Sequence, residues 1–217
     1  MRILFFSLAL AAFAVGCSND DSSATAIQTF CDTTCNTDTF RFEGTHKLKP
    51  VVTISPKNCT GDTLTWTHNG LEAGRQMHLG TMLENLVRLN NSAIDCYIHE
   101  DKYAWLSFND CNTGRGYLMK LPFDKKDAVK NFKSAINSFD KKFVVPQDLR
   151  AYADYSNIYV VDIAKDTTER MTFKEEYKIN WNDIHSTIDS VNISRNRIFV
   201  QLIKDGKPVQ IEKAISL

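Results

Sequence analysis

Short segments in which apolar and polar residues alternate recur along most of the chain. Alternation with a period of two is typical of β-strands that bury one face, and turn residues bound these segments, as at Asn69-Gly70 and Asp205-Gly206. Consecutive strands with short connections pair antiparallel. We therefore expect a mainly β fold of antiparallel meanders, with strands over residues 39–44, 50–55, 63–67, 93–99, 102–108, 117–121, 149–155, 157–163, 170–173, 187–193, 197–203 and 208–214.

Several of these strands are apolar at successive positions, as in residues 158–163 (IYVVDI) and 197–203 (RIFVQLI). Such strands indicate sheets that are covered on both faces, which suits a β-sandwich or stacked propeller blades. The runs GRGYLMKLPF (114–123) and SNIYVVDIAKDTTERMTF (156–173) resemble blade strands of β-propellers. The resemblance implies blade-like sheets of about four strands each.

Residues 124–143 depart from the strand pattern. Their apolar residues recur at steps of three and four, namely Val129, Phe132, Ile136, Phe139 and Phe143. This spacing predicts one packed amphipathic α-helix, with Asp124 as its N-cap. The lysines between them form either a solvated face or a face that meets anionic lipid headgroups.

The N-terminus has the features of a secretory signal peptide over residues 1–16. Arg2 precedes a largely apolar stretch over residues 3–15, which is shorter than the roughly 20 residues of a membrane span. Ala14-Val15-Gly16-Cys17 resembles the lipobox of bacterial lipoproteins, and the resemblance implies that Cys17 carries lipid and becomes the new N-terminus. The alternative is an ordinary signal peptide with a cysteine near its end.

Cys17 is followed by a polar and acidic run, SNDDSS, which predicts a solvated tether over residues 17–28. This run resembles the export signal of Bacteroidetes-type surface-exposed lipoproteins, although any polar spacer would share its composition. We expect a cell-envelope protein that its lipid anchors in the outer membrane, with residues 29–217 forming a single β-rich domain.

The charge balance argues against nucleic acid as a partner. The chain has 26 basic and 26 acidic residues, so no field of one sign is available to attract a polyanion. The partners that remain are the membrane, through the lipid, and a glycan or another envelope protein.

Cysteines in an exported chain favour disulfides, because that compartment is oxidising. An odd number remains once Cys17 is set aside, so one thiol stays unpaired. Cys96 and Cys111 flank a predicted hairpin and form the pair that we expect first, while Cys31 and Cys35 are within reach of Cys59. A zinc site at Cys31-x3-Cys35 is the alternative, but it lacks the paired short spacings of such sites. We expect no metal and no cofactor.

The sequence holds no motif of nucleophilic, phosphate-binding or zinc-protease catalysis, and we assign no catalytic residue. Aromatic residues on or beside predicted strands could stack on sugar rings or peptide side chains, although core packing is the alternative. These candidate binding residues are Trp66, Trp105, Tyr117 and Trp181.

The functional expectation is therefore a non-enzymatic binding or assembly module. One alternative is an envelope enzyme such as a glycoside hydrolase, which would show two carboxyl groups facing each other across a cleft. The other is an accessory subunit of an outer-membrane transporter.

Overall fold

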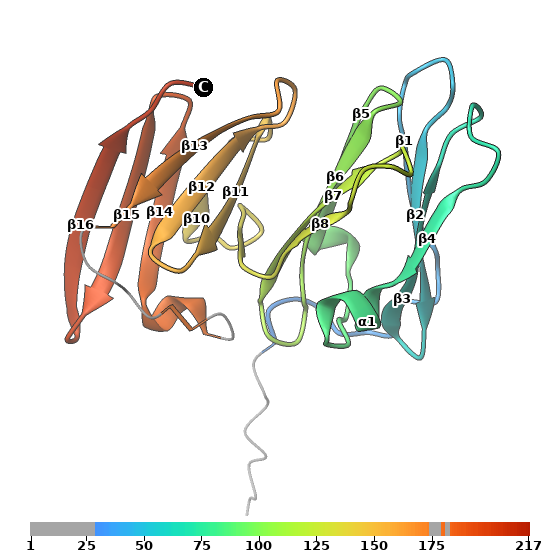
Figure 1. The fold of residues 1–217 in the computed structure, drawn as a ribbon. Helices are drawn as coiled ribbons and strands as arrows, with labels where there is room; N and C mark the ends of the chain where they lie inside the picture. Colours follow the sequence, from blue (N-terminus) through green and yellow to red (C-terminus); the bar gives the residue numbers. More distant parts are fainter. Residues whose placement is uncertain (1–28, 174–178, 181–182) are drawn as a thin grey trace, which may run out of the picture.

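The computed structural model describes residues 29–173, 179–180 and 183–217 (Figure 1). The predicted signal peptide, Cys17, the whole predicted tether and Trp181 lie outside these residues. The described chain is mainly β with one α-helix, as the sequence predicts. Its strands form four sheets of four strands each, which we name A to D in chain order.

Sheets A and B are antiparallel meanders in which consecutive strands are neighbours. Sheet A contains β1 (Phe40–Glu43), β2 (Val51–Lys57), β3 (Thr60–Thr67) and β4 (Arg75–His78). Sheet B contains β5 (Ile94–His99), β6 (Tyr103–Asn109), β7 (Gly116–Pro122) and β8 (Lys130–Phe132). Between them lie α1 (Leu79–Leu83) and the 3-10 turn η1 (Asn91–Ala93).

Sheet D contains one short strand from the part of the chain that otherwise forms sheet C. Sheet C contains β9 (Ala135–Ile136), β11 (Leu149–Asp154), β12 (Asn157–Asp162) and β13 (Thr167–Thr172). Sheet D contains β10 (Phe143–Val144), β14 (Ile188–Ser194), β15 (Arg197–Lys204) and β16 (Lys207–Ala214), with the 3-10 turn η2 (Ile184–Ser186) before β14. The short strand β10 precedes β11 in the chain but pairs with β14, in parallel. The connection from β9 to β11 therefore reaches from sheet C to sheet D and back.

The four sheets stand side by side in a row, in the order D, C, B, A from left to right in Figure 1. One apolar layer joins A to B and includes Trp66 and Phe108; another joins C to D and includes Ile158 and Val200. A smaller layer joins B to C through residues such as Trp105 and Val161. Sheets B and C are thus covered on both faces, as the continuous apolar runs predict. The described sheets are blade-like and form an open row, because A and D lie at its two ends.

The helix predicted over residues 124–143 is wrong, because this segment contains β8, β9 and β10. Its apolar residues belong to different layers: Val129 packs between A and B, Phe132 between B and C, and Ile136 and Phe143 between C and D. One helical face could not reach three layers. The Asp124 side chain accepts a hydrogen bond from the Lys126 N–H at 2.9 Å, which makes a turn and not a helix cap.

Both predicted turns join antiparallel strands, but neither Asn69 nor Gly70 has the positive φ of a tight two-residue turn. β3 and β4 pair antiparallel across the loop that contains Asn69-Gly70, and β15 and β16 are joined by Asp205-Gly206. Asp205 and Gly206 have φ values of 51° and 72°, as a type I′ turn requires. The strands that sequence patterning missed are the short ones, β4, β8, β9 and β10.

The cysteine pairing differs in part from the expected one, because Cys59 has one of its two expected partners whereas Cys111 does not have Cys96. Disulfides join Cys31 to Cys111 and Cys35 to Cys59, and Cys96 is the free cysteine. The expected bridge between Cys96 and Cys111 is wrong, because Cys96 lies opposite Leu106 in the ladder, whereas Cys111 lies beyond the end of β6. The odd number of cysteines after Cys17 correctly predicts one unpaired thiol.

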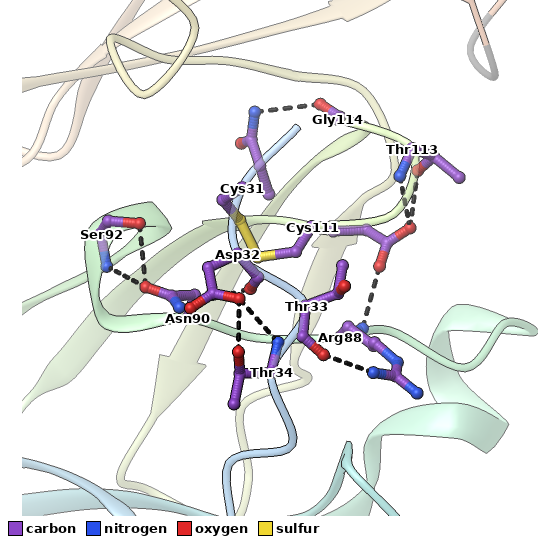
Figure 2. The surroundings of a disulfide bond; sticks show 12 residues. Cys31, Asp32, Thr33, Thr34, Arg88, Asn90, Ser92, Cys111, Thr113 and Gly114 are labelled. Carbon is purple, nitrogen blue, oxygen red and sulfur yellow. Dashed lines mark hydrogen bonds between the residues drawn. A yellow bond between two sulfur atoms is a disulfide. The ribbon is translucent and has the colours of Figure 1, made fainter. Parts of the chain in front are cut away.

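The N-terminal segment is fastened to the β6–β7 turn around the first disulfide (Figure 2). The N–H groups of Phe30 and Cys31 donate to the Cys111 carbonyl at 2.8 and 3.3 Å. The Arg88 guanidinium donates to the Thr33 carbonyl at 2.5 Å. The segment therefore enters the fold at sheet B, in the interior of the row, before the chain forms sheet A.

Ion pairs join sheet C to sheet D. Asp162, at the end of β12, has a fully buried side chain and accepts from Arg195 Nη1 at 2.8 Å, while Arg195 Nε donates to Asp148 at 2.9 Å. Burial by itself raises the pKa of Asp162, but hydrogen bonds from the Lys165 backbone and from Arg195 outweigh burial and lower the pKa to about 2. The Asp162 carboxylate is therefore charged at neutral pH and pairs with Arg195.

We predict that the double variant Cys31→Ala/Cys111→Ala lowers the free energy of unfolding by roughly 3 to 5 kcal/mol, because this disulfide closes a loop of 80 residues. Urea denaturation followed by tryptophan fluorescence measures the change. The variant Cys96→Ala, which removes the free thiol, is the control and should shift the urea midpoint much less. Equal midpoints for the wild type and the double variant would contradict the pairing.

Candidate functional site

A cavity of about 570 Å³ lies between sheets B and C, within the usual size range of small-molecule sites. Three segments form its walls: β5 with the adjoining part of β6, the connection from β9 to β11, and the start of β11. The lining residues include Ile94, Asp95, Cys96, Tyr97, Ser107, Ile136, Asn137, Ser138, Phe139, Val145, Pro146, Gln147, Leu149, Arg150 and Ala151. The β9–β11 connection, which contains β10, thus also forms one wall of the cavity.

A row of buried amide and hydroxyl groups forms the polar wall. Asn137 Nδ2 donates to Asn109 Oδ1 at 2.6 Å and to Ser107 Oγ at 3.4 Å. All three residues are at least nine-tenths buried. Buried polar groups are costly unless they find hydrogen-bond partners, so this network fixes the start of the β9–β11 connection against β6.

An ion pair crosses the cavity from sheet B to sheet C. Arg150 on β11 is 7% exposed, and its Nη2 donates to the carboxylate of Asp95 on β5. Its Nη1 donates to the carbonyls of Gln147 and Leu149 at 2.9 and 3.0 Å. Burial lowers the pKa of Arg150, and the nearby Asp95 opposes this effect.

One donor of this guanidinium is unsatisfied. Among the described residues, the buried Nε–H of Arg150 has no acceptor. Nε and Nη2 lie on the same edge of the planar guanidinium, so Asp95 uses one of two parallel donors. An unpaired buried donor costs about 1 to 3 kcal/mol, which a bound carbonyl or hydroxyl oxygen could recover.

Cys96 lines the cavity but does not have the properties of a nucleophile. Burial raises the pKa of its thiol above the usual range, and the neighbouring Asp95 raises it further. The reactive form of cysteine is the thiolate. The Cys96 side chain is therefore a protonated, weakly polar part of the wall.

Aromatic rings fill the rest of the interface between sheets B and C. Phe132 stacks on Trp105 and on Tyr152 with ring centroids 6.5 and 3.8 Å apart, and Tyr152 stacks on Tyr159 at 4.9 Å. Lys120 adds an ion pair to Asp166 at 2.5 Å. These contacts hold the two sheets together beside the cavity, so its walls are supported by packed side chains.

The structure does not bring the sequence-predicted aromatic residues together at a surface. Trp66, Trp105 and Tyr117 are 1%, 2% and 2% exposed. Trp66 Nε1 donates to the Pro122 carbonyl at 2.8 Å within the layer between A and B. These three residues are core residues and not stacking platforms, and Trp181 lies outside the described residues.

Sequence reasoning missed Ser107, Asn137 and Arg150. Two of them carry a usable signal: Ser107 and Arg150 are polar residues inside strands whose other residues are mostly buried. In a strand covered on both faces, such a residue must find a buried partner. Asn137 falls in the segment that was predicted to be helical.

Within the described ranges, no group of three or more His, Cys, Asp or Glu side chains could hold a metal ion. No helix in that part of the chain is long and apolar enough to cross a membrane. No family model, no curated protein and no solved structure matches the chain.

We predict energetic coupling between Asp95 and Arg150, because the Asp95 side chain is 55% exposed but its removal leaves the buried guanidinium of Arg150 without a counter-ion. A double-mutant cycle with Asp95→Ala and Arg150→Met, measured by urea denaturation, should give a coupling energy on the order of 1 to 3 kcal/mol.

The control is the exposed pair Arg41–Glu43, which is 2.7 Å apart with both side chains more than half exposed. Its coupling should stay below about 1 kcal/mol. Coupling of Asp95 and Arg150 no larger than that of the control would show that the pair does not join the two sheets.

Proposed function

We propose that this chain is a lipid-anchored protein of the cell envelope whose β-rich part is a non-enzymatic binding or assembly module. The cavity between sheets B and C is the proposed binding site. The observation that carries the proposal is the buried guanidinium of Arg150 at the cavity wall, with one N–H that has no acceptor. This N–H is covered by protein atoms, so a bound oxygen atom that reached it through a side-chain movement would complete the hydrogen bonding of Arg150.

The envelope assignment rests on the N-terminal sequence and is consistent with the cysteine chemistry. The short apolar stretch ends at Cys17, and a polar acidic run follows. Four of the remaining cysteines form two disulfides, which are typical of proteins that fold outside the reducing cytoplasm. These features support an anchor in the outer membrane and exposure of the folded part to the envelope.

The composition of the cavity favours binding over hydrolysis. Asp95 is its one carboxylate among the described residues, and Asp95 is already paired with Arg150. A glycoside hydrolase would need a second carboxyl group facing the first. The cavity instead offers apolar walls, buried amide and hydroxyl groups, and an ion pair without net charge.

The first test concerns the anchor. Metabolic labelling with a radioactive fatty acid, followed by mass spectrometry of the N-terminus, should find acyl chains on the wild type and none on Cys17→Ser. Cys96→Ser is the matched control and should keep the label, because the proposal assigns acylation to Cys17 alone. An unlabelled wild type, or a mature protein that retains Met1, would refute the anchor.

The second test concerns the cavity. Gln147 is exposed at the cavity wall and contributes its backbone carbonyl to Arg150, so Gln147→Trp should fill the opening and leave that hydrogen bond in place. Saturation-transfer NMR with a mixture of monosaccharides, amino acids and small neutral aromatic compounds should detect binding to the wild type and a loss of signal with Gln147→Trp.

The control for this test is Gln76→Trp, which adds the same indole to an exposed position on β4 of sheet A. It should bind the mixture as the wild type does. Signals that survive equally in Gln147→Trp, or no signal with any protein, would remove the cavity as a small-molecule site.

A further inference from the structure

The cavity follows the free edge of a strand. Four consecutive residues of β5, from Ile94 to Tyr97, line it. Side chains of neighbouring strand residues point to opposite faces of the sheet. A cavity that meets all four must therefore reach the backbone edge of β5, in addition to the face of sheet B that carries Ser107 of β6.

This edge carries unpaired backbone groups. β5 is the outermost strand of sheet B and pairs with β6 alone. Among the described residues, no further backbone ladder reaches its other side. Across the cavity, β9 pairs with β11 at Ala151 and Tyr152 and leaves Leu149 and Arg150 beyond its end. The cavity thus separates the open edge of β5 from the start of β11, where the Leu149 N–H donates to the Pro146 carbonyl at 3.0 Å and the Leu149 carbonyl accepts from Arg150.

The β5 edge lacks the protection that other long edges of this protein have. Natural edge strands are blocked by lysine, proline or bulges. The edge strand β16 begins with Lys207-Pro208, and β13 carries Glu169-Arg170 at its centre. β5 (IDCYIH) has no lysine, arginine, proline or register shift, and its one carboxylate is paired with Arg150.

We propose that an extended peptide segment of a partner protein binds here by adding a strand to β5, with one apolar side chain in the cavity. This inference rests on the proposed binding function and names its ligand class. A peptide backbone is the chemical group that matches an unpaired strand edge, since it offers N–H and C=O groups at the same repeat. The half-buried residues Phe139, Val145 and Pro146 supply the apolar wall for the inserted side chain.

The ion pair fits a neutral backbone as the ligand. Asp95 and Arg150 cancel each other's charge at the cavity, so a charged group would have to displace one of them. A neutral peptide backbone beside Arg150 would instead leave the pair intact.

The test uses a phage-displayed library of random twelve-residue peptides. The target of the selection is a protein that begins at residue 18 and is exported from the cytoplasm during expression, so that both disulfides form. Selected peptides should contain an apolar residue within a stretch of β-forming residues. A synthetic copy of an enriched peptide should bind the wild type and Gln76→Trp equally, and bind Gln147→Trp at least tenfold more weakly.

The decisive measurement is a scan in which each amide of that peptide is N-methylated in turn. Methylation at alternate residues, whose N–H groups face β5, should weaken binding about tenfold, since each position removes a hydrogen bond and adds a clash. Methylation at the residues between them should have little effect. A loss without a period of two would overturn strand addition.

The two proposals fail separately. Binding of the small-molecule mixture in the cavity, together with no peptide that prefers the wild type over Gln147→Trp, would overturn the peptide inference and leave the binding function. The absence of both kinds of binding would overturn both.

Discussion

Burial of both faces of sheets B and C is the constraint on which the rest of the structure depends. A sheet in this position needs apolar residues at successive positions, and β6, whose residues are all buried, meets that need. Any polar residue in such a strand must find a partner inside the protein. Ser107 finds Asn137, and Arg150 finds Asp95. The polar wall of the cavity therefore arises from the same burial that stabilises the row of sheets.

The strand content was predictable from sequence, because alternation and continuous apolar runs report directly how a strand is buried. The segment 124–143 was not predictable in this way. Its apolar residues are spaced as in a helix, but Val129, Phe132 and Ile136 pack into three different layers. The spacing of apolar residues in a short segment cannot distinguish a helix that packs one face against a single layer from several short strands that pack into different layers.

The cavity was less predictable than the fold. The aromatic residues that sequence reasoning selected are large and mostly apolar, and burial of Trp66, Trp105 and Tyr117 follows from that property. The residues that line the cavity come from β5, β6, β11 and the β9–β11 connection, whose strand β10 pairs with sheet D. Their meeting depends on the order in which the sheets stack, and no short segment of sequence carries that information. The disulfide partners of Cys111 and Cys59 depend on the same tertiary arrangement.

The bridge between Cys31 and Cys111 also decides how the molecule bears mechanical load. A force that pulls on the N-terminal segment passes through the sulfur atoms to the turn after β6 and bypasses the residues between Cys31 and Cys111. Sheet A, although it comes first in the chain, is shielded from the pull and cannot be peeled away strand by strand from that end. Tension enters instead at sheet B, whose strands are held by packed layers on both sides.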